Sequence, residues 1–145
     1  MNLRPHLRLL VAVPAAIALA ALATGCGDDD TTSLAARDLD GRTFVVTTAE
    51  GQALVEGSQV SIAFADGSIS VQGGCNTLFG GYAIDGSTLA LTGPLASTRM
   101  ACADDLMAQD DWLAAMLADA PDVELVGDAL TLATDDVRLT ATEST

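Results

Sequence analysis

The chain has 145 residues, half of them apolar, and a formal net charge of −14 without a single lysine. This length suits one domain, and the apolar share is sufficient for a core, although only three Phe, one Tyr and one Trp can fill it. Because a protein that binds DNA or RNA needs a basic face against the phosphates, this composition excludes a nucleic acid partner.

The first 25 residues have the pattern of an export signal. Two early arginines precede an uncharged apolar run over 9–23, which is short for a membrane span but typical of a secretory leader. The run ends in the letters ATGC, which resemble a bacterial lipobox that closes at Cys26. We therefore expect 1–25 to be a lipoprotein signal peptide and Cys26 to carry acyl chains such as palmitate. An ordinary signal peptide and an uncleaved apolar helix are the alternatives.

Residues 26–38 are polar and acidic, without an apolar period, and are predicted to be a flexible tether. The run of Asp28, Asp29 and Asp30 could also suggest a metal site, but a charge run beside an anchor is more typical of a solvated spacer. The expected location is the cell envelope, as a membrane-anchored lipoprotein on the extracytoplasmic side.

A β pattern begins at residue 39 and predicts one domain over 39–141, followed by a short tail over 142–145. Alternating or β-branched runs occupy 44–48 and 59–64, and further alternating pairs follow them. Short turn pairs of Asp and Gly separate several of these runs, which favours antiparallel hairpins. The predicted turns are Asp66-Gly67, Asp85-Gly86 and Gly127-Asp128.

One segment, at about 104–119, is rich in helix-forming residues and interrupts the β pattern. Leu106, Leu113 and Leu117 fall on one stripe of this predicted helix. Trp112 lies beside the stripe, where packing over the helix–sheet seam is favoured over a role as a ligand platform. The expected fold class is α+β: a single domain with a mainly antiparallel sheet, able to curl toward a barrel, and one packed helix.

Two cysteines remain once Cys26 is assigned to lipid. Cys75 and Cys102 are 27 positions apart and would lie in an oxidising compartment, so we expect a disulfide. The alternative is a pair of free thiols with redox chemistry. It is disfavoured because the two cysteines lack C-x-x-C spacing and have no basic neighbour except Arg99.

The stretch between these cysteines carries a family resemblance. GCN at 74–76, GGY at 80–82, DG at 85–86 and STRMAC at 97–102 resemble the signature of the META domain family, which includes the heat-shock protein HslJ. The resemblance extends in register over about 39–141. It implies a compact α+β domain of bacterial envelope lipoproteins, linked to stress or antibiotic tolerance and without an established enzymatic activity.

The residues of this signature allow two interpretations. Asn76, Tyr82, Thr98 and Arg99 could line a binding cleft, or they could form a structural knot stapled by the disulfide, which is the favoured reading. Asn76 would then bond its own turn. The glycines in this stretch are expected to adopt backbone angles closed to other residues; they are Gly73, Gly74, Gly80 and Gly81.

The chain lacks the side chains that most catalytic mechanisms use. Its only histidine is His6, in the leader, and without lysine it has no Schiff-base residue or Ser-Lys dyad. We expect no catalytic residues, no metal site and no cofactor. The predicted function is a non-catalytic, lipid-anchored envelope protein that binds an envelope protein or glycan in a stress response. The alternatives are a carboxylate-dependent envelope hydrolase and an acidic cation-binding protein.

Overall fold

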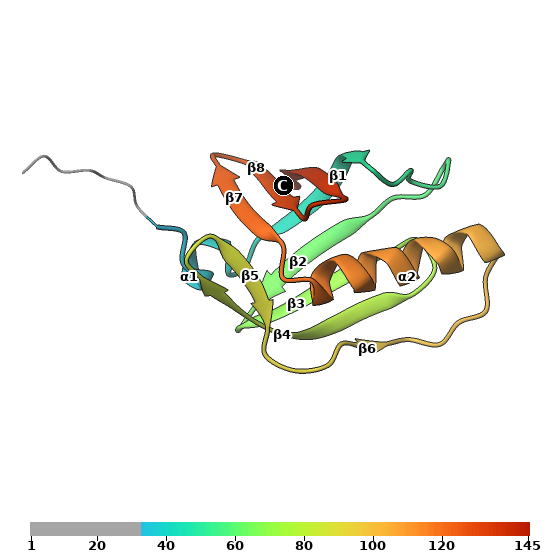
Figure 1. Ribbon diagram of the computed structural model, residues 1–145, viewed down its shortest axis with the longest axis horizontal. Helices are drawn as coiled ribbons and strands as arrows, with labels where there is room; N and C mark the ends of the chain where they lie inside the picture. The colour runs from blue at the N-terminus through green and yellow to red at the C-terminus, as the bar shows by residue number, and fades with distance from the viewer. Residues whose placement is uncertain (1–32) are drawn as a thin grey trace, which may run out of the picture. The chain divides into compact units, whose positions relative to one another are not determined.

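Short antiparallel strands dominate the computed structural model, which describes residues 33–145 (Figure 1). The predictions for the signal peptide, for Cys26 and for the acidic run at 28–30 lie outside the described residues. The elements are α1 (Ala36–Leu39), β1 (Thr43–Glu50), β2 (Ser61–Ala65), β3 (Ser68–Gln72), β4 (Thr77–Asp85), β5 (Thr88–Leu91), β6 (Ala96–Ser97), α2 (Asp104–Ala118), β7 (Asp122–Val126), β8 (Ala129–Ala133) and β9 (Arg138–Glu143).

Eight of these strands close into a barrel. Their order is β3-β2-β1-β9-β8-β7-β5-β4, and a further pairing of β3 with β4 completes the ring. The seam between β5 and β7 is the weakest, with the single register pair Thr88↔Asp122. The two-residue strand β6 pairs with the first half of β4, on the same edge that β5 uses further along. The α+β class and the curling of one antiparallel sheet are thus confirmed.

The hairpin turns follow from their glycines. Asp66 and Gly67 both have positive φ, at 51° and 73°, which is the geometry that matches the twist of the flanking strands. The turn of the next hairpin lies one residue later than predicted. Asp85 still pairs with Thr88, so the two turn residues are Gly86 and Ser87.

The core is aliphatic with a small aromatic centre. Phe64 makes edge contacts with both Phe44 and Tyr82, at centroid distances of 6.1 and 5.1 Å. Helix α2 contributes Leu113, Met116 and Leu117 to this core. Two of the three leucines of the predicted stripe are therefore in the core, whereas Leu106 is half-buried and lies outside it. Trp112 is partly buried against the same cluster, which agrees with a packing role. Within 33–145, neither helix is long and apolar enough to span a bilayer.

The folded part extends beyond the predicted range of 39–141 at both ends. Helix α1 begins at Ala36, within the segment 26–38 assigned to the tether, and ends at the fully buried Leu39, where the predicted domain starts. At the other end, β9 continues to Glu143, which pairs with Phe44. The predicted tail at 142–145 is therefore too long, because its first two residues continue the strand.

An ion pair joins Arg42, just before β1, to Glu143 at the end of β9. The Arg42 guanidinium contacts the Glu143 carboxylate at 2.5 Å, donates a hydrogen bond to the Gly127 carbonyl at 2.9 Å and lies 5.0 Å from the centre of the Phe44 ring. The hydrogen bond from Arg42 lowers the pKa of Glu143 below its ordinary value of 4.5.

The lowered pKa of Glu143 predicts an acid-dependent loss of stability. The contribution of its carboxylate is fully present above pH 4.5 and is lost as the pH falls through the lower pKa of the folded state. Glu143→Gln should therefore unfold at a lower Tm than the parent protein at pH 7, and the difference should shrink below pH 4.5. Thermal melts across this range test the prediction, with the exposed Glu124→Gln as control. A difference between parent and Glu143→Gln that is constant with pH would contradict it.

Candidate binding site beside the disulfide

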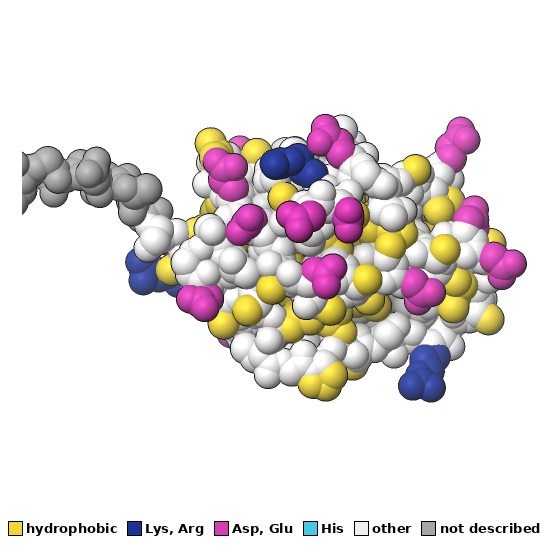
Figure 2. All heavy atoms as spheres, in the orientation of Figure 1, with side chains coloured by type: hydrophobic (Ala, Val, Ile, Leu, Met, Phe, Trp, Pro, Cys, Tyr) yellow, Lys and Arg dark blue, Asp and Glu magenta, His cyan; other side chains and the backbone are white. Residues whose placement is uncertain are grey.

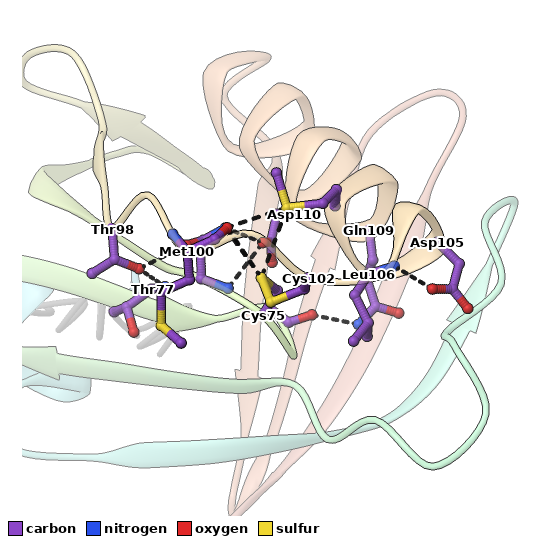
Figure 3. Close-up of a disulfide and its surroundings, with 12 residues drawn as sticks. Cys75, Thr77, Thr98, Met100, Cys102, Asp105, Leu106, Gln109 and Asp110 are labelled. Atoms are coloured by element: carbon purple, nitrogen blue, oxygen red, sulfur yellow. Dashed lines mark hydrogen bonds between the residues drawn. A yellow bond between two sulfur atoms is a disulfide. The ribbon is translucent and has the colours of Figure 1, made fainter.

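The predicted disulfide is present. Cys75, in the loop between β3 and β4, is bonded to Cys102, two residues before α2, and the two Cα atoms are 6.0 Å apart (Figure 3). The bond therefore ties the loop that carries the GCN letters to the end of the STRMAC segment. This covalent link brings two distant parts of the chain to the entrance of the helix.

Asn76 connects the same two segments through its side chain. The residue is only 5% exposed. Its Oδ1 accepts hydrogen bonds from the Met100 amide at 2.8 Å and from the Thr98 hydroxyl at 3.0 Å. The Thr98 hydroxyl oxygen in turn accepts the Thr77 amide at 3.0 Å. Asn76 thus holds the segment after β6 along the start of β4.

Helix α2 completes the network with a buried carboxylate. Asp110 is 5% exposed, and its Oδ2 accepts hydrogen bonds from the Asn76 amide at 2.9 Å and from Asn76 Nδ2 at 3.0 Å. Its Oδ1 has no hydrogen-bond partner among residues 33–145 and lies against Gly73. A buried polar atom without a partner is costly, so the contacts made by Oδ2 are what hold this residue in place.

Gln109, one position earlier on α2, also connects the helix to neighbouring loops through hydrogen bonds. Its side-chain oxygen accepts the Val55 amide at 2.6 Å, while its nitrogen donates to the Gly73 carbonyl and to the Ser58 hydroxyl. The loop between β1 and β2, the loop between β3 and β4, and the helix are therefore joined by two adjacent polar side chains. Sequence reasoning missed both Gln109 and Asp110. The available signal was their position on the helix stripe, between Leu106 and Leu113.

The glycines of this stretch serve close packing more than unusual backbone angles. Of the four that were expected to need such angles, only Gly74 has a positive φ, of 105°. A Cβ on Gly73 would collide with the Asp110 carboxylate, and one on Gly81 would collide with the Thr92 hydroxyl. Gly80 lies near Leu95. The expected backbone angles are therefore wrong for Gly73, Gly80 and Gly81, which have no positive φ. At these positions a neighbouring side chain leaves little or no space for a Cβ, which is why glycine is favoured there.

A trough of about 550 Å³ lies between α2 and the segment 95–101, and we call it the α2–β6 trough. Its inner surface is mostly apolar, and Met100 on its rim is 60% exposed. In the ribbon view the segment runs below α2, and β4 lies between the two (Figure 1). The residues that line it are Asn76, Leu78, Leu95, Ser97, Thr98, Arg99, Met100, Ala101, Met107, Asp110, Asp111 and Ala114.

Three of the four residues proposed for a cleft meet in this trough. Asn76, Thr98 and Arg99 line it. Tyr82 does not, because it is buried against Phe64 inside the barrel, where its hydroxyl donates to the Ala36 carbonyl at 3.1 Å. Burial raises the pKa of Tyr82, as expected for a phenol inside a core. The predicted cleft is thus corrected by removing Tyr82.

Charge around the trough is unbalanced. Residues 33–145 hold all but three of the 20 acidic residues but only four arginines, and acidic side chains are scattered over the face seen in Figure 2. Arg99 and Asp111 lie on opposite walls of the trough. In the described part of the chain, no group of three or more His, Cys, Asp or Glu side chains is arranged to hold a metal ion. The trough is therefore suited to contact by an apolar ligand with polar or charged edges.

This chain is similar to a protein family, to one curated relative and to two solved structures. The META domain matches residues 37–145. The heat shock protein HslJ of Escherichia coli (strain K12) is 29% identical over 130 residues, which cover 88% of this chain and 92% of HslJ. A protein solved by NMR is 29% identical, with a TM-score of 0.64, over 75% of this chain and 94% of its own. An NMR structure from Burkholderia xenovorans has a TM-score of 0.63 at 23% identity, covering 76% of this chain and 86% of its own.

Removing the buried carboxylate should destabilise the fold. Asp110→Ala leaves the amide and side-chain nitrogen of Asn76 without their shared acceptor, so we expect a loss of about 3 kcal/mol in the free energy of unfolding. The neighbouring Asp111→Ala is a matched control because Asp111 is exposed, and its effect should stay below about 0.5 kcal/mol. Urea unfolding measures both. Equal effects of the two substitutions would contradict the assigned role of Asp110.

Removing the disulfide should cost a comparable amount. The sequence separation of 27 between the two cysteines predicts a loss of about 3.5 kcal/mol for the double variant Cys75→Ser, Cys102→Ser. Unfolding of the parent protein in urea with and without reductant should reproduce this difference. The double variant should no longer respond to reductant. An unchanged unfolding midpoint in reductant would show that the bond contributes nothing.

Proposed function

Since this chain belongs to the META domain family, we propose that it is a non-catalytic protein of the cell envelope, anchored by lipid at Cys26, that binds a partner in the α2–β6 trough during stress. The observation that carries the proposal is the trough, an apolar surface with an exposed methionine on a strongly acidic domain. Contiguous exposed apolar surface on a small domain is typical of a place where a partner binds.

The lipid anchor and the envelope location rest on the sequence. The ATGC letters that end in Cys26 follow an apolar run of signal-peptide length. The stress context rests on the relative, because the protein of Escherichia coli is named a heat shock protein.

The non-catalytic role is supported by the chemistry of the trough. Asp110 is the buried acid that lines it, and its Oδ2 already accepts two hydrogen bonds from Asn76. Asp111 is exposed and points about 100° away from Asp110 around the helix axis. These two carboxylates therefore do not face each other across a substrate, as a pair of glycosidase acids would.

The anchor is tested by fractionation. The parent protein should remain with membranes and partition into detergent, and Cys26→Ser should abolish this partitioning because the lipidated thiol is gone. Mass measurement of the processed protein gives the added acyl mass directly. A mature form that begins elsewhere, or one without lipid, would contradict the proposed anchor.

The binding role is tested with two substitutions on one helix. Ala114 lines the trough and Ala115 is exposed outside it, and each lies four residues after an aspartate. Glutamate is a good helix former at both positions. Affinity capture from membranes of stressed cells should recover the same partner with the parent and with Ala115→Glu, but not with Ala114→Glu. Recovery that is unaffected by Ala114→Glu would contradict binding in the trough.

A further inference from the structure

We propose that the α2–β6 trough binds an extended polypeptide segment, which adds as a strand to the free edge of residues 97–99 and places apolar side chains against α2. This inference rests on the proposed function and specifies the partner of the same site. Two independent features support it: the backbone of the segment on one wall, and the side chains of the trough.

The backbone of β6 has one satisfied edge and one open edge. Ala96 and Ser97 pair with Phe79 and Leu78 of β4, and the Thr98 amide donates to the Thr77 carbonyl at 3.1 Å. This bond makes Ser97 and Leu78 a non-hydrogen-bonded pair of the antiparallel ladder. The amide and carbonyl of Ser97 therefore point away from β4. Within the described residues, β6 pairs with no other strand.

Backbone groups continue to point alternately toward and away from β4 past the end of β6. The Met100 amide donates to Asn76 Oδ1 at 2.8 Å, and the Met100 carbonyl also faces Asn76. The amides of Thr98 and Met100 and the Met100 carbonyl are thus directed toward β4 and Asn76, whereas the Thr98 carbonyl accepts the Ser97 hydroxyl at 2.7 Å. No hydrogen bond within residues 33–145 engages the amide or carbonyl of Arg99. Ser97 and Arg99 therefore present two sets of backbone groups on one edge, about 7 Å apart, which is the repeat of a β-strand.

Such an edge is a template for strand addition. Edge strands are normally protected by charge, proline or a cover, and a peptide that adds to one gains main-chain hydrogen bonds. All six residues from Ala96 to Ala101 are exposed, and Arg99 is the only charged one among them. The segment is nevertheless held in place by a buried asparagine and a disulfide, so its edge is fixed before any ligand arrives.

The side chains of the trough indicate what the peptide carries. Alternate residues of an added strand would face Leu78, Met107 and Ala114, which favours apolar side chains at every second position. Methionine side chains adapt to different apolar shapes, so this surface does not require one sequence. The strongly negative domain attracts a partner with positive charge, which favours lysine or arginine beside the apolar positions. A fatty acyl chain would fill the trough but leave the backbone of Ser97 and Arg99 unused.

The test uses a proline that removes no backbone hydrogen bond. Ser97→Pro and Ser97→Ala both lose the hydroxyl that donates to the Thr98 carbonyl at 2.7 Å, so the two variants differ in the amide at position 97. Because the Ser97 amide points away from β4, Ser97→Pro should keep the fold but block the edge, whereas Ser97→Ala keeps the amide. The probe is a short fluorescent peptide of alternating valine and threonine with lysines at both ends. Its binding to the processed full-length protein in lipid nanodiscs is followed by anisotropy, with empty nanodiscs as blank.

The expected result is that the parent and Ser97→Ala bind the peptide and that Ser97→Pro binds it about tenfold more weakly. The proline removes the amide donor at position 97, and its ring obstructs the approach of the peptide backbone. The same peptide with alternate amides N-methylated should bind about tenfold more weakly to the parent. Unchanged melting curves of Ser97→Pro confirm that the fold is intact. If that variant unfolds, the N-methylated peptide alone decides between the outcomes.

Equal binding by Ser97→Pro and Ser97→Ala, or by the methylated and unmethylated peptides, would overturn strand addition. Displacement of an environment-sensitive probe in the trough by palmitate, together with no peptide binding, would assign the trough to an acyl chain and would also overturn the inference. In either case a partner that is captured by the parent but not by Ala114→Glu would leave the proposed function standing.

Discussion

The structure around the trough depends on the hydrogen bonds of one buried asparagine. The side chain of Asn76 accepts a hydrogen bond from the Met100 amide in the segment after β6 and donates one to the Asp110 carboxylate on α2. The backbone amide of Asn76 donates to the same carboxylate. A single residue therefore joins a strand, an exposed segment and a helix, and it does so where water is excluded and each bond is strong. The disulfide one residue earlier restricts the same three parts covalently. Without this junction the segment 96–101 would have only a two-residue strand to hold it.

This junction explains why Gly73 and the buried Asp110 occur together. Gly73 leaves the space that the Asp110 carboxylate occupies, and that carboxylate satisfies the nitrogen atoms of Asn76. Each member is tolerable only in the presence of the others, because an unpaired buried carboxylate or amide costs several times the gain of one hydrogen bond. The functional consequence is an exposed but ordered wall on one side of an apolar trough. A fixed surface binds with a smaller loss of conformational entropy than a mobile loop does.

Much of the fold could be predicted from local pattern. Alternation of apolar residues, turn pairs such as Asp66-Gly67, and the leucine stripe of α2 each act over a few residues, so the sequence shows them directly. The disulfide could be inferred because only two cysteines remained. The barrel closure and the place of Tyr82 could not, because both depend on which distant strands meet. Tyr82 lies on β4 and faces the interior of the barrel. Only its packing against Phe64 shows that its side chain is not part of the cleft.

The central claim is that Asn76 holds the exposed segment 97–100 extended with alternate amides turned outward. Amide hydrogen exchange measured by NMR on the processed protein tests this claim residue by residue. The amides of Thr98 and Met100 should exchange slowly, since they donate to Thr77 and Asn76, while those of Ser97 and Arg99 should exchange at nearly the rate of an open chain. Equal and rapid exchange at all four positions would show a mobile loop, and would contradict both the junction and the edge that it presents.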